Sequence, residues 1–118
     1  MIKKVLIIED DNDTLELLLH IVSHLNFECS DSKFTLPLDE LDRIKPDLIL
    51  LDHWLPNEYG ADYCNKIKSS DATRRIPVII ISFVAKLAEI ALNSKADAHI
   101  AKPFEVDELE DLIRKMIK

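Results

Sequence analysis

The sequence predicts a doubly wound α/β sandwich, in which helices cover both faces of a parallel sheet. Two observations support this prediction: short runs of consecutive apolar residues, and segments of helical periodicity between them. Apolar runs that do not alternate with polar residues are typical of strands buried on both faces, as in parallel sheets. Five strand–helix units in succession predict right-handed crossovers and a three-layer arrangement.

Four apolar runs have the length of strands, and one further segment is a candidate edge strand. The runs lie at residues 5–8, 48–51, 78–81 and, more weakly, 98–101. The further segment, residues 27–32, is short and polar, which fits a strand at the edge of the sheet. We therefore expect five strands in one sheet.

Helical periodicity separates these runs. Apolar residues recur at helical spacing from Leu15 to Leu25, where residues 11–13 offer N-cap side chains and Asn26 suits a left-handed stop. Four more periodic segments lie at residues 38–44, 63–67, 87–91 and 106–116.

Length and charge narrow the class of protein. A chain of 118 residues suits one domain, which we expect to span residues 1–118. The net charge of -7 argues against binding nucleic acid through a basic face. No apolar stretch approaches the roughly 18 residues of a membrane span, and no signal peptide is recognisable. Cys29 and Cys64 lack metal-ligand spacing and suit free thiols in a reducing compartment, so we expect a cytoplasmic protein.

The first apolar run ends in three adjacent carboxylates, in the stretch VLIIEDD. Like charges so close together repel, and each is costly to desolvate. Acidic residues are common at a helix N-terminus, where they complement the helix dipole. The alternative is a cation site. This stretch alone does not decide between the two interpretations.

Charged or hydroxyl side chains follow the other apolar runs as well. Asp52, Ser82 and Lys102 come directly after residues 48–51, 78–81 and 98–101. Each of them alone fits a helix cap, a turn residue or a solvated lysine. The carboxyl ends of parallel strands share one edge of the sheet, however, and ligands bind there. Such coincidences at successive strand ends therefore favour a common site.

The chemistry of this set is coherent. Glu9, Asp10 and Asp52 are hard oxygen donors, and three carboxylates in one cleft need a divalent cation such as Mg²⁺ to offset their repulsion. Lys102 could bind an anion, and Ser82 offers a hydroxyl donor. Together these groups indicate phosphoryl transfer to a carboxylate nucleophile.

Four stretches of the sequence match a known family: VLIIEDD, PDLILLDHWLP followed by NEYG, IPVIIIS and AKPF. Through them the chain resembles, over essentially its whole length, the receiver domain of two-component response regulators. It implies a flavodoxin-like fold of five βα units, with a parallel five-stranded sheet in the order 2-1-3-4-5. It also implies a phosphoprotein of a phosphorelay, which catalyses only its own phosphorylation and dephosphorylation.

The resemblance assigns a role to each matching residue. Asp52 is expected to accept the phosphoryl group from a phosphohistidine of a partner, Ser82 to act as the hydroxyl switch, and Lys102 to pair with the phosphoryl group. The peptide bond between Lys102 and Pro103 is expected to be cis.

The metal site follows in the same way. Glu9, Asp10 and Asp52 are expected to hold Mg²⁺, Asp10 directly and Glu9 through water. The backbone carbonyl of Trp54 is a further expected ligand. We expect the Trp54 ring to lie near the mouth of the cleft.

Three features depart from the family pattern. Phe83 stands where a small residue is usual, so its ring should narrow access to Asp52. His99 occupies the aromatic switch position, either as a half-buried histidine with one hydrogen bond or as a pH-sensitive switch. The segment between Ser82 and His99 is shorter than usual, so we expect a short or displaced fourth helix.

We expect a stand-alone receiver that acts through protein partners. Its expected partners are a histidine kinase or a histidine phosphotransfer protein, and a downstream output protein. We expect no direct binding of nucleic acid or membrane, and phosphorylation-dependent homodimerisation is an option. Two alternatives are a degenerate receiver that serves as a binding scaffold and an aspartate-nucleophile phosphohydrolase. The latter usually carries a second acid two residues after the nucleophile, where this chain has Trp54.

Overall fold

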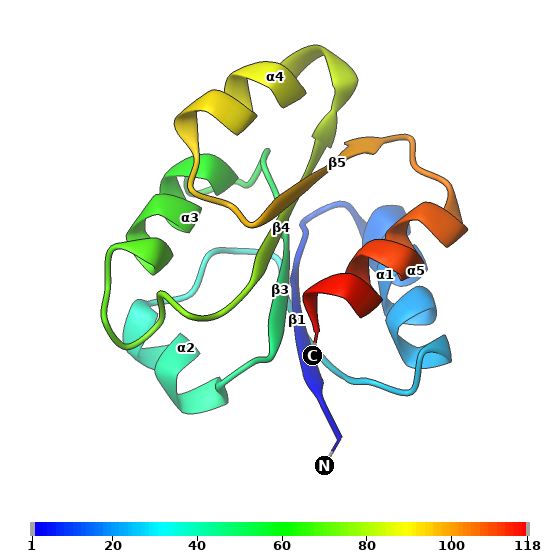
Figure 1. Cartoon of the computed structure of the whole chain (residues 1–118), viewed down its shortest axis with the longest axis horizontal. Helices are drawn as coiled ribbons and strands as arrows, with labels where there is room; N and C mark the ends of the chain where they lie inside the picture. Colours follow the sequence, from blue (N-terminus) through cyan, green and yellow to red (C-terminus); the bar gives the residue numbers. More distant parts are fainter. Residues whose placement is uncertain (1, 118) are drawn as a thin grey trace.

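A computed structural model describes residues 2–117 of the chain as a three-layer α/β sandwich (Figure 1). All strand pairs are parallel, and the sheet order β2-β1-β3-β4-β5 confirms the predicted fold. The strands are β1 (Lys4–Ile8), β2 (Glu28–Ser32), β3 (Leu48–Asp52), β4 (Val78–Phe83) and β5 (Ala98–Lys102). The helices are α1 (Asn12–His24), α2 (Leu38–Ile44), α3 (Gly60–Lys68), α4 (Val84–Asn93) and α5 (Val106–Met116).

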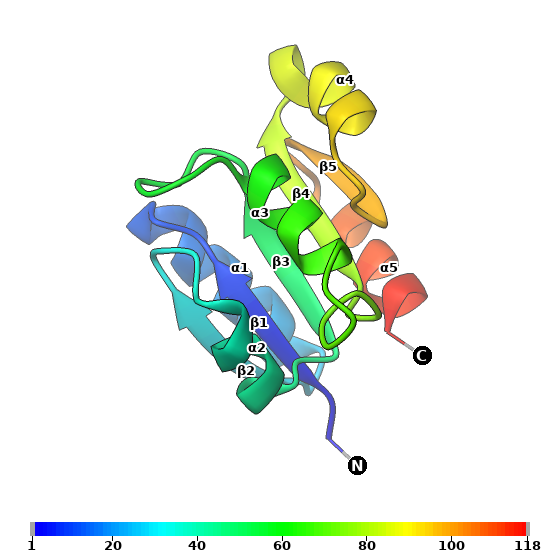
Figure 2. The ribbon, with the colours of Figure 1, turned by 90° about the vertical axis from the view of Figure 1, so that its left-hand side faces the viewer.

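Helices cover both faces of the sheet, which explains the unbroken apolar strands. Helices α1 and α5 pack on one face, and α2, α3 and α4 pack on the other (Figures 1 and 2). Within β1, Val5 and Ile7 point to the first core, whereas Leu6 and Ile8 point to the second. Successive residues of one strand therefore point to opposite faces of the sheet, and both faces need apolar side chains. Within residues 2–117 the structure has no helix that is long and apolar enough to cross a bilayer.

The strands reach further than their apolar runs. Asp52 and Lys102 are the last residues of β3 and β5, and β4 continues through Ser82 to Phe83. In the sheet register Ser82 faces Ala101, and Phe83 faces Lys102. The sequence placed these polar side chains just after the strands, and the structure corrects this by one or two residues. The sheet itself therefore fixes their backbones.

The fourth helix differs from its expected form. Helix α4 has ten residues and is longer than α2 and α3, which does not fit the expectation of a short helix. The alternative, a displaced helix, stays a prediction. Helix α4 begins directly after Phe83, the last residue of β4. Among the α4 side chains that the structure describes, only Ile90 is buried.

Local signals for helix ends are confirmed in two places. The Asp11 side chain accepts a hydrogen bond of 2.9 Å from the backbone N–H of Thr14 and caps α1. Asn26 follows that helix with a φ of 66°, in the left-handed region. The Lys102–Pro103 peptide bond is cis, as the family resemblance implied.

Gly60 begins α3 at a point of very close backbone approach. A Cβ atom there would lie 2.5 Å from the carbonyl oxygen of Asp52 and 2.8 Å from Cα of His53. The Gly60 N–H also donates to the carbonyl of His53, at 2.8 Å. Only glycine lets the first residue of α3 lie this close to the end of β3. Gly60 therefore fixes where the loop that carries Trp54 ends.

We expect Gly60→Ala to destabilise the protein by roughly 1–3 kcal/mol, because backbone atoms rather than a flexible side chain must move to admit the methyl group. Chemical denaturation monitored by circular dichroism would measure the change. Ser69→Ala, an exposed substitution after the same helix, should stay within about 0.5 kcal/mol of wild type. Equal stability of the two variants would contradict this account of Gly60.

Candidate functional site

The carboxyl ends of β1, β3, β4 and β5 surround a cleft at one edge of the sheet. The side chains that line it come from these strand ends and from the loops that follow them. They belong to Glu9, Asp10, Asp11, Thr14, Asp52, Trp54, Phe83 and Lys102. The structure thus brings most of the site residues predicted from sequence into one place.

Three carboxylates converge in this cleft. Glu9, Asp10 and Asp52 each offer an oxygen atom, and these oxygens all lie within 4.8 Å of one another. Glu9 and Asp52 are 1% and 4% exposed, whereas Asp10 is an exposed residue of the cleft. This set of oxygen donors fits a hard divalent cation such as Mg²⁺, which accepts a few carboxylates and keeps waters.

The three adjacent carboxylates of VLIIEDD divide between two tasks. Glu9 and Asp10 turn into the cleft, while Asp11 turns to α1 and receives hydrogen bonds from the hydroxyl and the N–H of Thr14, at 2.7 and 2.9 Å. These hydrogen bonds lower the pKa of Asp11. The helix-cap interpretation is therefore correct for Asp11, and the geometry of a cation site applies to its two predecessors.

Lys102 partly neutralises the buried carboxylates. Its Nζ lies 2.8 Å from Oε1 of Glu9 and 3.1 Å from Oδ1 of Asp52. Burial lowers the pKa of Lys102, but the hydrogen bonds and charges of Glu9 and Asp52 outweigh that effect and raise it. The ammonium group is therefore held charged between two acids at the carboxyl ends of β1 and β3.

One ammonium group does not balance three acids. Burial, followed by the charge of Glu9, raises the pKa of Asp52 to about 7, although Lys102 acts in the opposite direction. The cleft thus holds an excess of negative charge that water cannot fully solvate. Added positive charge would stabilise it.

Ser82 is fully buried at the end of β4. Within residues 2–117, its Oγ is the one buried side-chain nitrogen or oxygen atom that has no hydrogen-bond partner. A buried hydroxyl without a partner costs about 1–3 kcal/mol, so it is a strong donor toward any acceptor that enters its reach.

Phe83 and Trp54 form the rim of the cleft. Phe83 is 57% exposed, and its ring centroid lies 5.9 Å from Nζ of Lys102. The Trp54 ring is 41% exposed and lines the same cleft, at the mouth as expected. The Phe83 ring is therefore exposed beside the lysine, and a narrowing of the entrance by this ring stays a prediction.

His99 does not line the cleft. It is half-buried, and its Nε2 lies 3.0 Å from the hydroxyl of Ser94. Burial lowers the pKa of the His99 imidazole, because it disfavours the charged form of the ring. This geometry is that of a half-buried histidine with one hydrogen bond.

Sequence reasoning missed the aromatic cluster next to the cleft, which consists of His53, Trp54 and Tyr59. The rings of His53 and Tyr59 stack at 5.3 Å, and Trp54 meets both of them edge-on. An isolated antiparallel β-bridge between the backbones of Trp54 and Tyr59 closes the loop that carries these rings. The signal was present in the letters HWLPNEYG, in which Gly60 permits the closure.

Comparison with known proteins places these features in a family. The family model of the response regulator receiver domain matches residues 5–114. The nisin biosynthesis regulatory protein NisR of Lactococcus lactis subsp. lactis is 32% identical over 121 residues, which cover 100% of this chain and 52% of that protein. The phosphate regulon transcriptional regulatory protein PhoB of Escherichia coli (strain K12) is 27% identical over 121 residues, which cover 100% and 53%. The chain spans about half the length of these curated relatives.

Solved structures agree on the fold. A response regulator of Chloroflexus aurantiacus J-10-fl superposes with a TM-score of 0.91 at 21% identity, covering 99% of this chain and 98% of that one. The receiver domain of the sensor histidine kinase PA1611 from Pseudomonas aeruginosa PAO1 gives a TM-score of 0.89 at 22% identity, with the same coverage of both chains. That structure contains a magnesium ion coordinated in its active site cleft.

The raised pKa of Asp52 predicts how stability depends on pH. A carboxyl whose pKa is higher in the folded protein than in the unfolded chain stabilises the fold at low pH, and this contribution is lost as pH rises through the folded value. For Asp52 the loss falls between about pH 4 and pH 7. Without divalent cations, Asp52→Asn should therefore be more stable than wild type at pH 8, by roughly 2–4 kcal/mol more than at pH 4.

Denaturant titrations of both proteins in chelator, at several pH values, would measure this difference. Asp111→Asn is the control, because it removes an exposed carboxylate on α5. A stability difference between Asp52→Asn and wild type that does not change with pH would show that the Asp52 carboxyl keeps an ordinary pKa.

Proposed function

Because this chain belongs to the response regulator receiver domain family, we propose that Asp52 is its phosphoacceptor. Receiver domains are phosphorylation-type switches rather than enzymes that turn over external substrates. One observation carries the residue assignment: Asp52 ends the central strand β3 and pairs with Lys102 in a cleft that also holds Glu9.

The proposed chemistry is a transfer of one phosphoryl group. A carboxylate oxygen of Asp52 attacks the phosphorus of a phosphohistidine on a partner, an acyl phosphate O–P bond forms, and the P–N bond breaks. The imidazole nitrogen keeps the electron pair and takes up a proton from solvent. Burial of the Asp52 carboxylate supports this role, because poor solvation favours attack by the ionised oxygen.

We propose that Glu9, Asp10, Asp52 and the backbone carbonyl of Trp54 hold Mg²⁺. When bound, this ion supplies positive charge against the carboxylates and the oxygens of the incoming phosphoryl group. The excess negative charge and the clustered oxygen atoms of the cleft support the assignment.

Lys102 and Ser82 are proposed to bind the phosphoryl oxygens. The Lys102 ammonium group already lies 3.1 Å from Asp52, so a small movement would bring it from the carboxylate to the phosphoryl group. The buried Ser82 hydroxyl would gain the acceptor that it lacks. A shift of the end of β4 toward the phosphoryl group would also move α4, because that helix follows Phe83 directly.

The wider assignments are also proposals. Residues 1–118 would form one receiver domain that receives its phosphoryl group from a histidine kinase or a histidine phosphotransfer protein. Its phosphorylation would change contacts with an output protein or with a second copy of the chain. His99, beside α4 through Ser94, is the candidate aromatic switch.

Incubation with acetyl phosphate and Mg²⁺ tests the phosphoacceptor, with intact mass as the measurement. Wild type should gain one phosphoryl mass, and the gain should require Mg²⁺, because three carboxylates otherwise repel the anionic donor. Asp52→Asn should not gain it, whereas the control Asp111→Asn should. Phosphorylation that persists in Asp52→Asn, or without Mg²⁺, would refute the assignment. Steady turnover of a generic phosphatase substrate would instead favour the phosphohydrolase alternative.

Phe83→Ala should speed both phosphorylation by acetyl phosphate and loss of the phosphoryl group, each by roughly threefold to tenfold. The ring stands exposed beside Lys102, where it narrows the entrance for small donors and for water. Time courses of intact mass, with and without donor, would give both rates. Leu92→Ala, which truncates an 86% exposed side chain on α4, is the control. Unchanged rates in Phe83→Ala would mean that the ring does not gate the cleft.

A further inference from the structure

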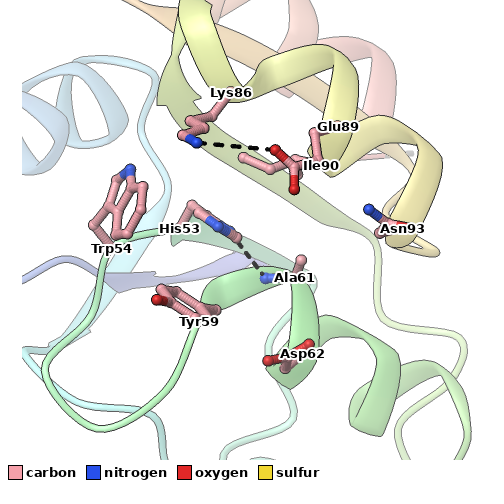
Figure 3. A pocket seen from close by; sticks show the side chains of 9 residues that line it. All are labelled: His53, Trp54, Tyr59, Ala61, Asp62, Lys86, Glu89, Ile90 and Asn93. Carbon is pink, nitrogen blue, oxygen red and sulfur yellow. Dashed lines mark hydrogen bonds and ion pairs between the residues drawn. The ribbon is translucent and has the colours of Figure 1, made fainter.

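A second pocket lies beside the cleft that contains Asp52. It is bounded by α4 on one side and by the loop before α3 on the other. Figure 3 shows Lys86, Glu89 and Asn93 of α4 facing the aromatic cluster and the first turn of α3 across this space. Its volume is about 270 Å³. Pockets for drug-sized ligands usually measure about 300–1,000 Å³, so this one suits a single side chain better than a cofactor.

The aromatic cluster forms one wall of the pocket. The ring planes of His53 and Tyr59 are within 10° of parallel, and the ring of Trp54 stands nearly perpendicular to both. Trp54 and Tyr59 are 41% and 51% exposed although they are large aromatic residues. Exposed aromatic rings favour planar cations, and the guanidinium group of arginine stacks on them better than a lysine ammonium group does.

Two carboxylates complement this wall. Asp62 lies in the first turn of α3 and Glu89 lies on α4, so acids stand on both sides of the pocket. Within residues 2–117, Asp62 takes part in no ion pair. Glu89 meets Lys86 only at 4.0 Å, and both side chains are more than half exposed, so this contact is weak (Figure 3).

The sequence position of Asp62 has a structural explanation, since acids are favoured in the first turn of a helix. Glu89 lies in the second turn of α4 and has no such reason to face the pocket. The chain as a whole carries a net charge of -7, which also favours a basic partner. Aromatic faces and acids from two elements therefore point to the same chemical class of ligand.

We propose that this pocket binds an arginine side chain of a partner protein. The guanidinium plane would stack on the exposed rings of Trp54 and Tyr59, while Asp62 and Glu89 would accept its hydrogen bonds. Trp54 also lines the phosphorylation cleft, so the bound partner would sit directly beside Asp52. The proposal does not depend on phosphorylation of Asp52.

Lys86 makes the proposal sharply testable. Its ammonium group lines the same pocket and competes with an incoming cation for Glu89. Removing this charge should strengthen binding of a guanidinium group, whereas removing the charge of Asp62 should weaken it. Both side chains are exposed, so neither substitution threatens the fold.

The test is an NMR titration with N-acetyl-arginine amide, monitored at the indole N–H of Trp54 and the backbone amide of Asp62. N-acetyl-citrulline amide, the uncharged isostere, is the matched probe. The arginine probe should give saturable shifts and the citrulline probe should bind at least about fivefold more weakly. Equal binding of the two probes, or no shift with either, would overturn the proposal.

Variants then distinguish binding in the pocket from a general electrostatic attraction of the probe to the negatively charged protein. Asp62→Asn should weaken binding of the arginine probe about fivefold, and Lys86→Gln should strengthen it about twofold to fivefold. Asp111→Asn and Lys115→Gln make the same charge changes on the exposed surface of α5 and should leave binding nearly unchanged. Equal effects of the α3/α4 pair and the α5 pair would show that only net charge matters and would refute the pocket.

Discussion

The contact of Lys102 with Glu9 and Asp52 is the interaction on which the rest of the site depends. It joins the ends of β1, β3 and β5, which are far apart in the sequence. Without this ammonium group, two buried carboxylates would face each other unpaired, at a cost of several kcal/mol. With it, the cleft still keeps an excess of acid, and that excess would favour a bound cation.

The sheet order explains why these groups meet. Strand β1 lies between β2 and β3, so the chain turns one way after β1 and the other way after β3. The following helices leave on opposite faces of the sheet and open a cleft between them. Burial of apolar side chains on both faces of the sheet holds the strand ends in register. The free energy gained by this burial offsets the repulsion between the acids at the strand ends.

Sequence patterns predicted the sheet, the helices and most of the cleft, because each depends on periodicity or on the residue at a strand end. Asp52 and Lys102 could be found in this way, since the edge of a parallel sheet is common to all its strands. The unpaired hydroxyl of Ser82 could not, because a missing partner is a property of the packed structure. The direct start of α4 after Phe83 also escaped prediction, because both strand and helix patterns tolerate the same apolar residues there.

The loop between β3 and α3 lines both the cleft at Asp52 and the neighbouring pocket between α3 and α4. It begins beside Asp52, carries Trp54 along the rim of one pocket and Tyr59 along the wall of the next, and ends at Gly60 against the Asp52 carbonyl. Both pockets carry acidic side chains, so on the proposals above a cation in one would lower the attraction for a cation in the other, and this coupling would be reciprocal. A phosphoryl group on Asp52 would return negative charge to the cleft. On the proposals above, the charge state of Asp52 would therefore set how strongly the neighbouring pocket holds a basic partner.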